Sequence, residues 1–168
     1  WLEERKPNAL FESRYYRKLH PECADSDPLL HYIEQGWREG ADPHPLFFTA
    51  WYEAEYPEST SKGRPPLAHY LHKGWREGKR PNPFTDFSAY LQAHPELVRQ
   101  GIHPLAHYVE QGFGDTSGPL PFFDAGYYLE DNPSAAGQEI SALAHYLQYG
   151  VREGRSGNRF LDPSYYLR

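Results

Sequence analysis

The stretch PLLHYIEQGWREG at residues 28–40 decides the fold, because it returns along the chain in a fixed register. It reappears as PLAHYLHKGWREG at residues 66–78, and in weaker form at residues 104–116 and 142–154. Each copy lies 38 residues after the one before, and an internal period of this length is typical of a tandem repeat. The recurring pairs are His31-Tyr32, His69-Tyr70, His107-Tyr108 and His145-Tyr146, and the recurring glycines are Gly36, Gly74, Gly112 and Gly150.

A second pattern precedes each copy, in which a tyrosine is followed five residues later by a proline. The tyrosines are Tyr16, Tyr52, Tyr90 and Tyr128, and the prolines are Pro21, Pro57, Pro95 and Pro133. The sequence therefore predicts an N-terminal flank at residues 1–10 and one repeat domain at residues 11–168. Its units are expected at about 11–46, 47–84, 85–122 and 123–160, with a partial fifth unit at 161–168.

Two short helices are expected in each unit. In the stretch FDAGYYLEDNP, Asp124 is suited to cap the first helix, Phe123 is suited to pack on Tyr128, and Pro133 should end the helix. In PLAHYVEQG, Pro104 fits the first helical position and Gly112 the left-handed C-terminal cap. Helices this short are unstable alone. The predicted fold is therefore all-α, with two-helix units of about 38 residues stacked as a short α-solenoid or a compact helical array.

The histidine of each His-Tyr pair has two interpretations. Leu29, Tyr32, Ile33 and Gly36 share the face of a helix that is expected to be core, whereas His31 lies on the opposite face. The favoured interpretation is structural: each histidine bonds to the backbone or a tyrosine of the next unit. The alternative is a row of imidazoles that face a ligand. A metal site is not expected, because one histidine per unit is too widely spaced for Zn–N bonds of about 2.0–2.1 Å.

An aromatic position one residue before each tyrosine varies between units, and it is the candidate ligand-facing row. Its members are Tyr15, Trp51, Tyr127 and Tyr165, while the third unit has Ala89 there. These rings are candidates to line a groove for an extended ligand such as a glycan chain, although rings at helical spacing more often pack units together. Four residues before this position most units have a large apolar side chain. In the third unit both positions hold small residues, Thr85 and Ala89, which predicts a contact between the two positions.

Composition excludes several function classes. The net charge is −6, and residues 81–140 hold one basic residue, Arg99, against eight acidic ones, which argues against nucleic-acid binding. The sequence has no apolar run long enough for a transmembrane segment and no signal peptide. It also has no catalytic motif and no cofactor motif. Because the sequence begins at Trp1 and contains no methionine, we expect it to be a segment of a longer protein.

The tetrapeptide GWRE at residues 36–39 looks like part of a site, but its column favours a structural role. The tryptophan position is occupied by Trp37, Trp75, Phe113 and Val151 in the four units. A site that needs an indole would not accept valine. The pattern therefore predicts a joint that ends one helical unit with a glycine, an apolar plug and an acidic residue.

The unit pattern F-D-x-x-Y-Y-L-x-x-x-P, then P-L-x-H-Y-L-x-x-G-W-x-E-G-R-x-P, resembles a short repeat of large bacterial proteins of surface-polysaccharide synthesis. There it accompanies glycosyltransferase domains, and similar units occur in some large secreted bacterial proteins. The resemblance covers residues 11–168 and implies a non-catalytic accessory module whose parent protein carries a transferase domain. The expected partner is a glycan chain or a partner protein domain. The alternatives are a protein-interaction or oligomerisation scaffold, a repeat region of a secreted surface protein, and an enzyme with an unrecognised site among the recurring histidines and glutamates. A cytoplasmic location, either free or at the membrane periphery, is favoured over secretion.

Overall fold

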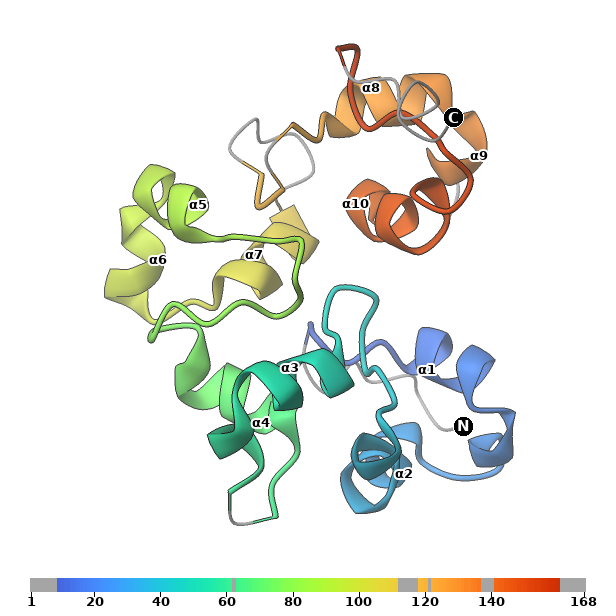
Figure 1. Cartoon of the computed structure of the whole chain (residues 1–168), viewed down its shortest axis with the longest axis vertical. Helices are drawn as coiled ribbons and strands as arrows, with labels where there is room; N and C mark the ends of the chain where they lie inside the picture. Colours follow the sequence, from blue (N-terminus) through green and yellow to red (C-terminus); the bar gives the residue numbers. More distant parts are fainter. Residues whose placement is uncertain (1–8, 62, 112–117, 121, 137–140, 161–168) are drawn as a thin grey trace.

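The structure is a computed structural model that describes residues 9–61, 63–111, 118–120, 122–136 and 141–160. These residues form short helices joined by loops, so the all-α prediction is confirmed (Figure 1). Within the described ranges, the β-type pairing is a single isolated bridge between His44 and Phe47. Tyr165, Gly112 and Phe113 lie outside the described residues.

The first helix of each unit contains the invariant tyrosine, which is Tyr16, Tyr52, Tyr90 or Tyr128. These helices are α1 (Ser13–Leu19), α3 (Thr49–Glu55), α5 (Ser88–Ala93) and α8 (Ala125–Asp131). In α8 the Asp124 side chain accepts a hydrogen bond from the backbone N–H of Tyr127 at 2.9 Å. The Phe123 ring packs on Tyr128 with centroids 5.5 Å apart. The predicted cap and the predicted apolar contact are both confirmed.

A further helical turn, which the sequence analysis missed, begins at each proline of the second pattern. These turns are η1 (Pro21–Cys23), η3 (Pro57–Thr60), α6 (Pro95–Gln100) and α9 (Pro133–Ala136). The first helix does end before the proline, as predicted. However, proline lacks only an N–H that the first position of a helix does not use, so the same residue starts the next turn. The expectation of two helices per unit was therefore incomplete.

The second helix of each unit carries the His-Tyr pair. These helices are α2 (Pro28–Glu34), α4 (Pro66–His69), α7 (Pro104–Gln111) and α10 (Ala142–His145). After α4 and α10 the chain continues in π-helical turns, η4 (Tyr70–Gly74) and η6 (Tyr146–Gly150), whereas a 3-10 turn, η2 (Gly36–Glu39), follows α2. The start of α7 at Pro104 agrees with the prediction.

In the first, second and fourth units a left-handed glycine follows the recurring glycine. A positive φ occurs at Gly40, Gly78 and Gly154, four residues after the recurring glycines Gly36, Gly74 and Gly150, whereas Gly112, for which the cap was predicted, lies outside the described residues. At these later positions the glycine ends the turn that follows the second helix. The earlier glycines have another role, which the site geometry explains.

Each unit is closed by a backbone hydrogen bond between its beginning and its end. The backbone N–H of the residue four positions before the invariant tyrosine donates to a carbonyl in the link that leaves the unit. The four bonds are Glu12 to Pro43 at 2.9 Å, Phe48 to Pro81 at 3.1 Å, Asp86 to Pro119 at 2.7 Å and Asp124 to Gly157 at 2.9 Å. Because the bond recurs in all four units, each unit is a closed loop that can be added as one block.

Residues of all four units belong to one main hydrophobic cluster, and a smaller cluster of Tyr128, Ala135 and Ala142 lies in the fourth unit. The main cluster of buried residues runs from Leu10 in the N-terminal flank to Ala144 in α10, and Leu147 packs against it. The side chains of Gln148 and Tyr149 lie beside the Tyr15 hydroxyl, so the fourth unit meets the first. Figure 1 accordingly shows α10 returning toward α1. The described residues therefore pack as a compact array.

One member of the predicted core face is not buried. The Ile33 side chain is 46% exposed, whereas Tyr32 and Gly36 on the same face are buried. Leu29 is half-buried, but its equivalents Leu67 and Leu143 are buried. No helix among the described residues is both long and apolar enough to cross a membrane.

Candidate functional site

A tyrosine and a histidine share a hydrogen bond inside every unit. The invariant tyrosine of the first helix reaches across to the histidine of the His-Tyr pair in the second helix. The Oη to Nδ1 distances are 2.9 Å for Tyr16 and His31, 2.9 Å for Tyr52 and His69, 2.7 Å for Tyr90 and His107, and 2.8 Å for Tyr128 and His145. The predicted structural role of the histidines thus has a geometric basis. The predicted partner was wrong, because the bond stays within the unit and does not reach the next one.

The recurring glycine lies directly beneath the tyrosine hydroxyl. A Cβ atom at Gly36 would lie 2.0 Å from Tyr16 Oη, and one at Gly74 would lie 2.2 Å from Tyr52 Oη. At Gly150 the nearest hydroxyl, that of Tyr128, would be 2.7 Å away. No side chain fits at such distances. This glycine is therefore required for close approach of the tyrosine to the second helix.

The second member of each His-Tyr pair fills the core. Tyr32, Tyr70 and Tyr108 are buried, and Tyr146 is half-buried against the smaller cluster of the fourth unit. Tyr70 packs on Tyr52 of its own unit with ring centroids 5.6 Å apart. These tyrosines therefore act as the apolar contact beside each polar Tyr–His pair.

In the first and third units a second histidine lies beside the pair. His20 stacks on Tyr16 at 4.5 Å and lies 6.0 Å from His31, measured between ring centroids. In the third unit His94 takes the same place, with its ring 5.6 Å from His107. A glutamate two residues later bonds this histidine in both units, at 2.9 Å in one and 3.2 Å in the other.

In the second and fourth units Tyr56 and Asn132 stand at the position of the second histidine, and a permanent cation contacts each of them. Lys79 lies over the Tyr56 ring at 4.5 Å and is paired with Glu58. Arg155 donates to the Asn132 side chain and pairs with Glu153, both at 2.5 Å. The two kinds of unit thus alternate along the chain, and each supplies one positive or protonatable group next to its Tyr–His pair.

In the second and fourth units the surroundings of the Tyr–His pair favour the neutral forms of both side chains. Burial raises the pKa of Tyr52 and Tyr128. Burial, with a contribution from the neighbouring Lys79, lowers the pKa of His69, and burial with Arg155 does the same for His145. A neutral hydroxyl bonded to a neutral imidazole holds two helices together, and it is a poor arrangement for proton transfer near neutral pH.

Among the described residues, the side chains that could bind a metal ion are not grouped. Across the described residues, no group of three or more His, Cys, Asp or Glu side chains is arranged to hold a metal ion. Cys23, the single cysteine, is buried and its thiol donates to the His20 carbonyl at 3.0 Å.

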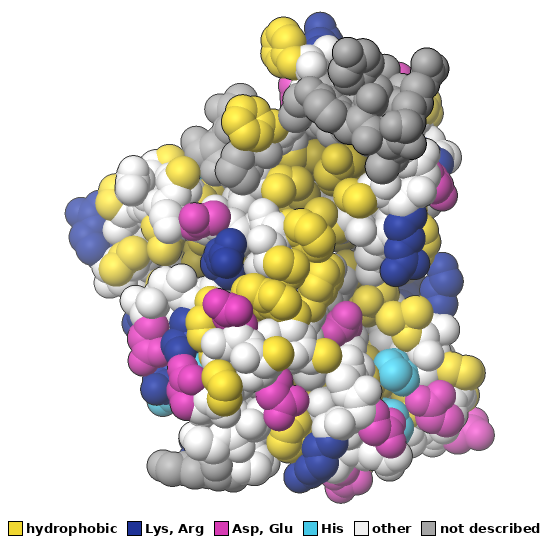
Figure 2. Space-filling view, in the orientation of Figure 1, with side chains coloured by type: hydrophobic (Ala, Val, Ile, Leu, Met, Phe, Trp, Pro, Cys, Tyr) yellow, Lys and Arg dark blue, Asp and Glu magenta, His cyan; other side chains and the backbone are white. Residues whose placement is uncertain are grey.

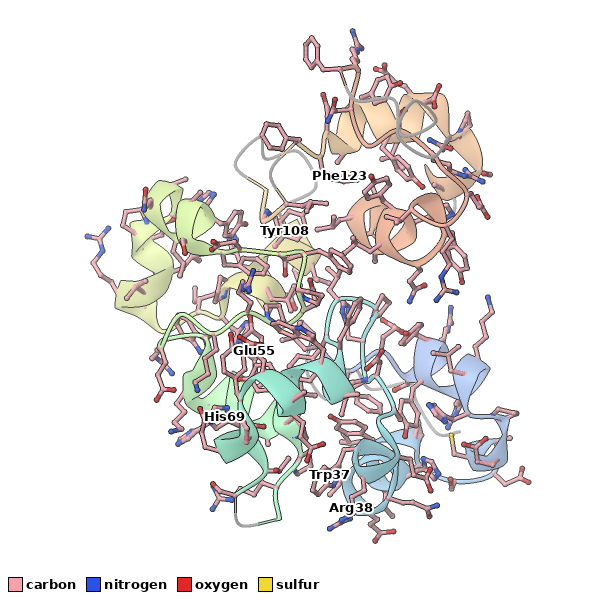
Figure 3. All side chains as sticks on the ribbon, viewed as in Figure 1. Trp37, Arg38, Glu55, His69, Tyr108 and Phe123 are labelled. Carbon is pink, nitrogen blue, oxygen red and sulfur yellow. The ribbon has the colours of Figure 1, made fainter. Side chains whose placement is uncertain are left out.

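The GWRE segment combines a buried tryptophan with an arginine that covers it. Trp37 is 5% exposed and donates through Nε1 to the Ile33 carbonyl at 3.0 Å. The Arg38 guanidinium lies 4.5 Å from the Trp37 ring and donates to the Glu34 carbonyl (Figure 3). The arginine thus satisfies a carbonyl at the end of the helix while its charge faces the indole.

This arrangement recurs in the second unit but not in the fourth. Trp75 is 4% exposed and Arg76 lies 4.3 Å from its ring, with a hydrogen bond to the His72 carbonyl. Val151, by contrast, is 47% exposed and does not fill the core as the tryptophans do. Among the three units in which the structure describes this position, the predicted joint has its buried apolar residue in the two with tryptophan, and the arginine contacts the ring beside it.

The variable aromatic side chains do not share one environment: an arginine lies beside Trp51 and Tyr127, whereas Tyr15 contacts the fourth unit. Trp51 is half-buried, meets Tyr56 edge-on at 6.1 Å and has the Arg80 guanidinium 5.8 Å from its ring. Tyr127 is half-buried, with Arg159 at 5.8 Å. Tyr15 lies at the junction of the first and fourth units. An arginine beside a partly exposed ring is thus shared by Trp51 and Tyr127 alone among the three described members.

The phenylalanine before each first helix packs on the invariant tyrosine. Phe11 lies 5.4 Å from Tyr16, and Phe47 lies 5.1 Å from Tyr52, between ring centroids. This is the contact that the sequence predicted for Phe123 and Tyr128, and it occurs in the first two units as well. In the third unit, where Thr85 replaces the phenylalanine, Phe87 supplies the ring and lies 5.9 Å from Tyr90.

Sequence reasoning missed the residue whose side chain caps the second helix in the first, third and fourth units, whereas Pro65 precedes α4 without such a bond. Asp27 accepts from the Leu29 N–H at 2.8 Å, and Ser141 accepts from the Ala144 N–H at 3.2 Å. His103, at the equivalent position of the third unit, accepts from the Ala106 N–H at 3.5 Å. The aspartate or serine before the helix was the available signal. The histidine was not recognisable as a cap, because histidine is not one of the residue types preferred at this position. Its ring also packs on Tyr70, with centroids 4.7 Å apart.

Comparison of the chain with protein families, curated proteins and solved structures gives no match.

Proposed function

We propose that this chain is a non-catalytic repeat module of a larger bacterial protein of surface-polysaccharide synthesis, and that it binds an extended glycan chain. The observation that carries the proposal is the pairing of a partly exposed ring with an arginine at Trp51 and Tyr127. Sugar rings stack on aromatic faces, and a guanidinium beside the ring can bind hydroxyl or carboxylate oxygens.

The polar groups of the repeat support a binding role over a catalytic one. The Tyr–His pairs join the two helices of each unit and are buried or half-buried, so the hydrogen bond between the two side chains serves the fold. Figure 2 shows hydrophobic side chains gathered in the middle of one face, where the units meet. A partly apolar face on a rigid array suits a long, uniform ligand.

The test measures retention on an immobilised rhamnose-containing polysaccharide, with dextran as the reference matrix. Trp51→Ala and Tyr127→Ala should each weaken retention about fivefold, which corresponds to the loss of one ring contact. Trp51 also packs against the core, so this variant is expected to melt at a lower temperature. Binding is therefore measured well below the melting transition.

Leu67→Ala is the matched control, because Leu67 is 4% exposed and its loss lowers stability without changing the surface. Retention that falls equally in Trp51→Ala and Leu67→Ala would show that the ring acts only in packing. The alternative function, a scaffold for another protein, predicts unchanged retention and a stable complex with a partner domain in light scattering.

A further inference from the structure

Two positions of the repeat change residue type together from unit to unit. The first position lies four residues after the invariant tyrosine, and the second lies ten residues after the histidine that bonds this tyrosine, which we call the paired histidine. In chain order the two positions hold His20 with Ala41, Tyr56 with Lys79, His94 with Ser117, and Asn132 with Arg155. Each unit therefore has one basic side chain across the two positions, either a histidine at the first or a lysine or arginine at the second.

In the first and third units the basic group is the histidine that lies beside the pair. The rings of His20 and His31 lie 6.0 Å apart, and those of His94 and His107 lie 5.6 Å apart, between centroids. In both units a glutamate bonds the first histidine and can compensate a positive charge on it. Histidine is the side chain that ordinarily changes its charge between pH 5 and pH 8. The basic group of these two units is therefore charged only in acid.

In the second and fourth units the basic group is a permanent cation. Lys79 and Arg155 each contact the residue at the first position and pair with a glutamate. After burial, this cation is the largest cause that lowers the pKa of the paired histidine, with Lys79 acting on His69 and Arg155 on His145. The reason is that a like charge nearby disfavours the protonated imidazole. The permanent cation thus helps to keep the paired histidine neutral.

Carboxylates also surround the paired histidines, and they act in the opposite sense because they favour the protonated ring. Lys79 and Lys73 act more strongly on His69 than Glu77 and Glu58 do, and Arg155 acts more strongly on His145 than Glu153 does. In the first unit the titratable groups around the two histidines are Tyr16, Glu22, Cys23, Glu39 and Asp42. Among the described residues of the third unit they are Tyr90 and Glu96.

We propose that the second histidine of the first and third units does on protonation what lysine and arginine do permanently in the other two units, which is to keep the paired histidine neutral. As the pH falls, a proton on His20 or His94 lies beside its glutamate, and the charge then opposes a second proton on the paired histidine 6.0 or 5.6 Å away. The hydrogen bond between a neutral tyrosine and a neutral histidine thus persists to lower pH. The inference concerns the fold and does not rest on glycan binding.

An NMR titration of the His31 ring in the whole 168-residue chain tests the proposal. In His20→Gln the midpoint of the His31 titration should rise by about 0.5 pH unit or more, because the neighbouring positive charge is lost. The exchange variant His20→Tyr with Ala41→Lys copies the second unit, and it should return the midpoint to the parent value or below. Lys18→Gln removes an exposed charge of α1 and is the matched control, for which the midpoint should not change. An unchanged His31 midpoint in His20→Gln would overturn the proposal.

Two further variants repeat the measurement in other units. His94→Gln should raise the midpoint of His107 in the same way, and it keeps the test decisive if His20→Gln does not fold. Lys79→Gln removes the permanent cation of the second unit and should raise the midpoint of His69 by a similar amount. Helical circular dichroism equal to that of the parent shows that a variant is folded. Folded variants in which neither midpoint rises, or in which Lys18→Gln has an equal effect on His31, would show that the basic positions do not control the paired histidines.

Discussion

At the scale of single residues, the fold depends on a gap the size of one methyl group. Gly74 leaves space for the Tyr52 hydroxyl, which in turn bonds His69. The sequence showed that the glycine recurs, but glycine is required both for positive φ and for close approach, and the pattern does not distinguish the two. Here both requirements occur four residues apart, at Gly74 and Gly78.

Gly74→Ala should therefore destabilise the protein by about 3 kcal/mol, because its Cβ would displace a buried tyrosine. Gly78→Ala should cost about 1–2 kcal/mol, since its φ is +73° but nothing lies within 4 Å of a new Cβ. Gly126→Ala, on the exposed side of α8, should be neutral or stabilising by up to about 1 kcal/mol. Urea unfolding of the three variants gives the ranking, and equal losses at Gly74 and Gly126 would contradict the packing role.

The Tyr–His bond can be tested as a pair. His69→Ala and Tyr52→Phe should each cost about 1–3 kcal/mol, because each leaves a buried polar atom without its partner. The double variant should cost less than the sum of the two, with a coupling energy of about 1 kcal/mol in a double-mutant cycle. Strictly additive losses would mean that the hydrogen bond contributes nothing to stability.

His103 predicts a dependence of stability on pH. Burial, with Arg76 nearby, lowers the pKa of His103 to about 3. The unfolded chain takes up a proton near the ordinary histidine pKa of about 6.5, whereas the folded protein does not, so stability falls as the pH drops from about 6.5 toward 3. His103→Asn retains an oxygen for the Ala106 N–H but cannot be protonated. Between pH 7 and pH 4.5 the parent should lose about 2 kcal/mol more than this variant in urea unfolding.

At the scale of elements, the sequence predicted features that depend on neighbouring residues. The Asp124 cap, the contact of Phe123 with Tyr128 and the start of α7 at Pro104 each follow from spacings of one turn. The bond that closes each unit was not predictable in this way. It joins backbone atoms such as the Glu12 N–H and the Pro43 carbonyl, and every residue carries these groups, so no side-chain pattern marks them.

The link between the first two units contains an acidic group whose charge is unfavourable. The Asp42 carboxylate accepts from the Thr49 N–H at 2.7 Å, and burial raises its pKa to about 6. Because the folded protein holds this proton more tightly than the unfolded chain, stability falls as the pH rises from about 4 to 6. Asp42→Asn keeps the hydrogen bond without the charge, and it should stabilise the protein at pH 8 by about 1–3 kcal/mol. The gain should vanish at pH 3.5, and a gain that persists there would have another cause.

At the scale of the whole molecule, the sequence predicted stacked helical units but not the rotation between neighbouring units. The rotation from one unit to the next depends on side-chain packing between units, and a repeat pattern constrains it only weakly. Tyr15 illustrates the consequence. The sequence groups it with Trp51 and Tyr127 as one aromatic column, but the return of the fourth unit places it beside Gln148 and Tyr149. Members of one column thus have different surroundings because the array has ends.

The junction of the first and fourth units predicts long-range coupling that an open stack would lack. Tyr15→Ala removes a half-buried ring from this junction, so the amides of α10 should lose protection in native-state hydrogen exchange along with those of α1. In an open stack the effect would spread through the second unit first and decay before reaching the fourth. Tyr127→Ala, which removes the equivalent ring from α8, should leave α1 unchanged and serves as the control. Loss of protection in α3 with α10 unaffected would show that the first and fourth units are not coupled in solution.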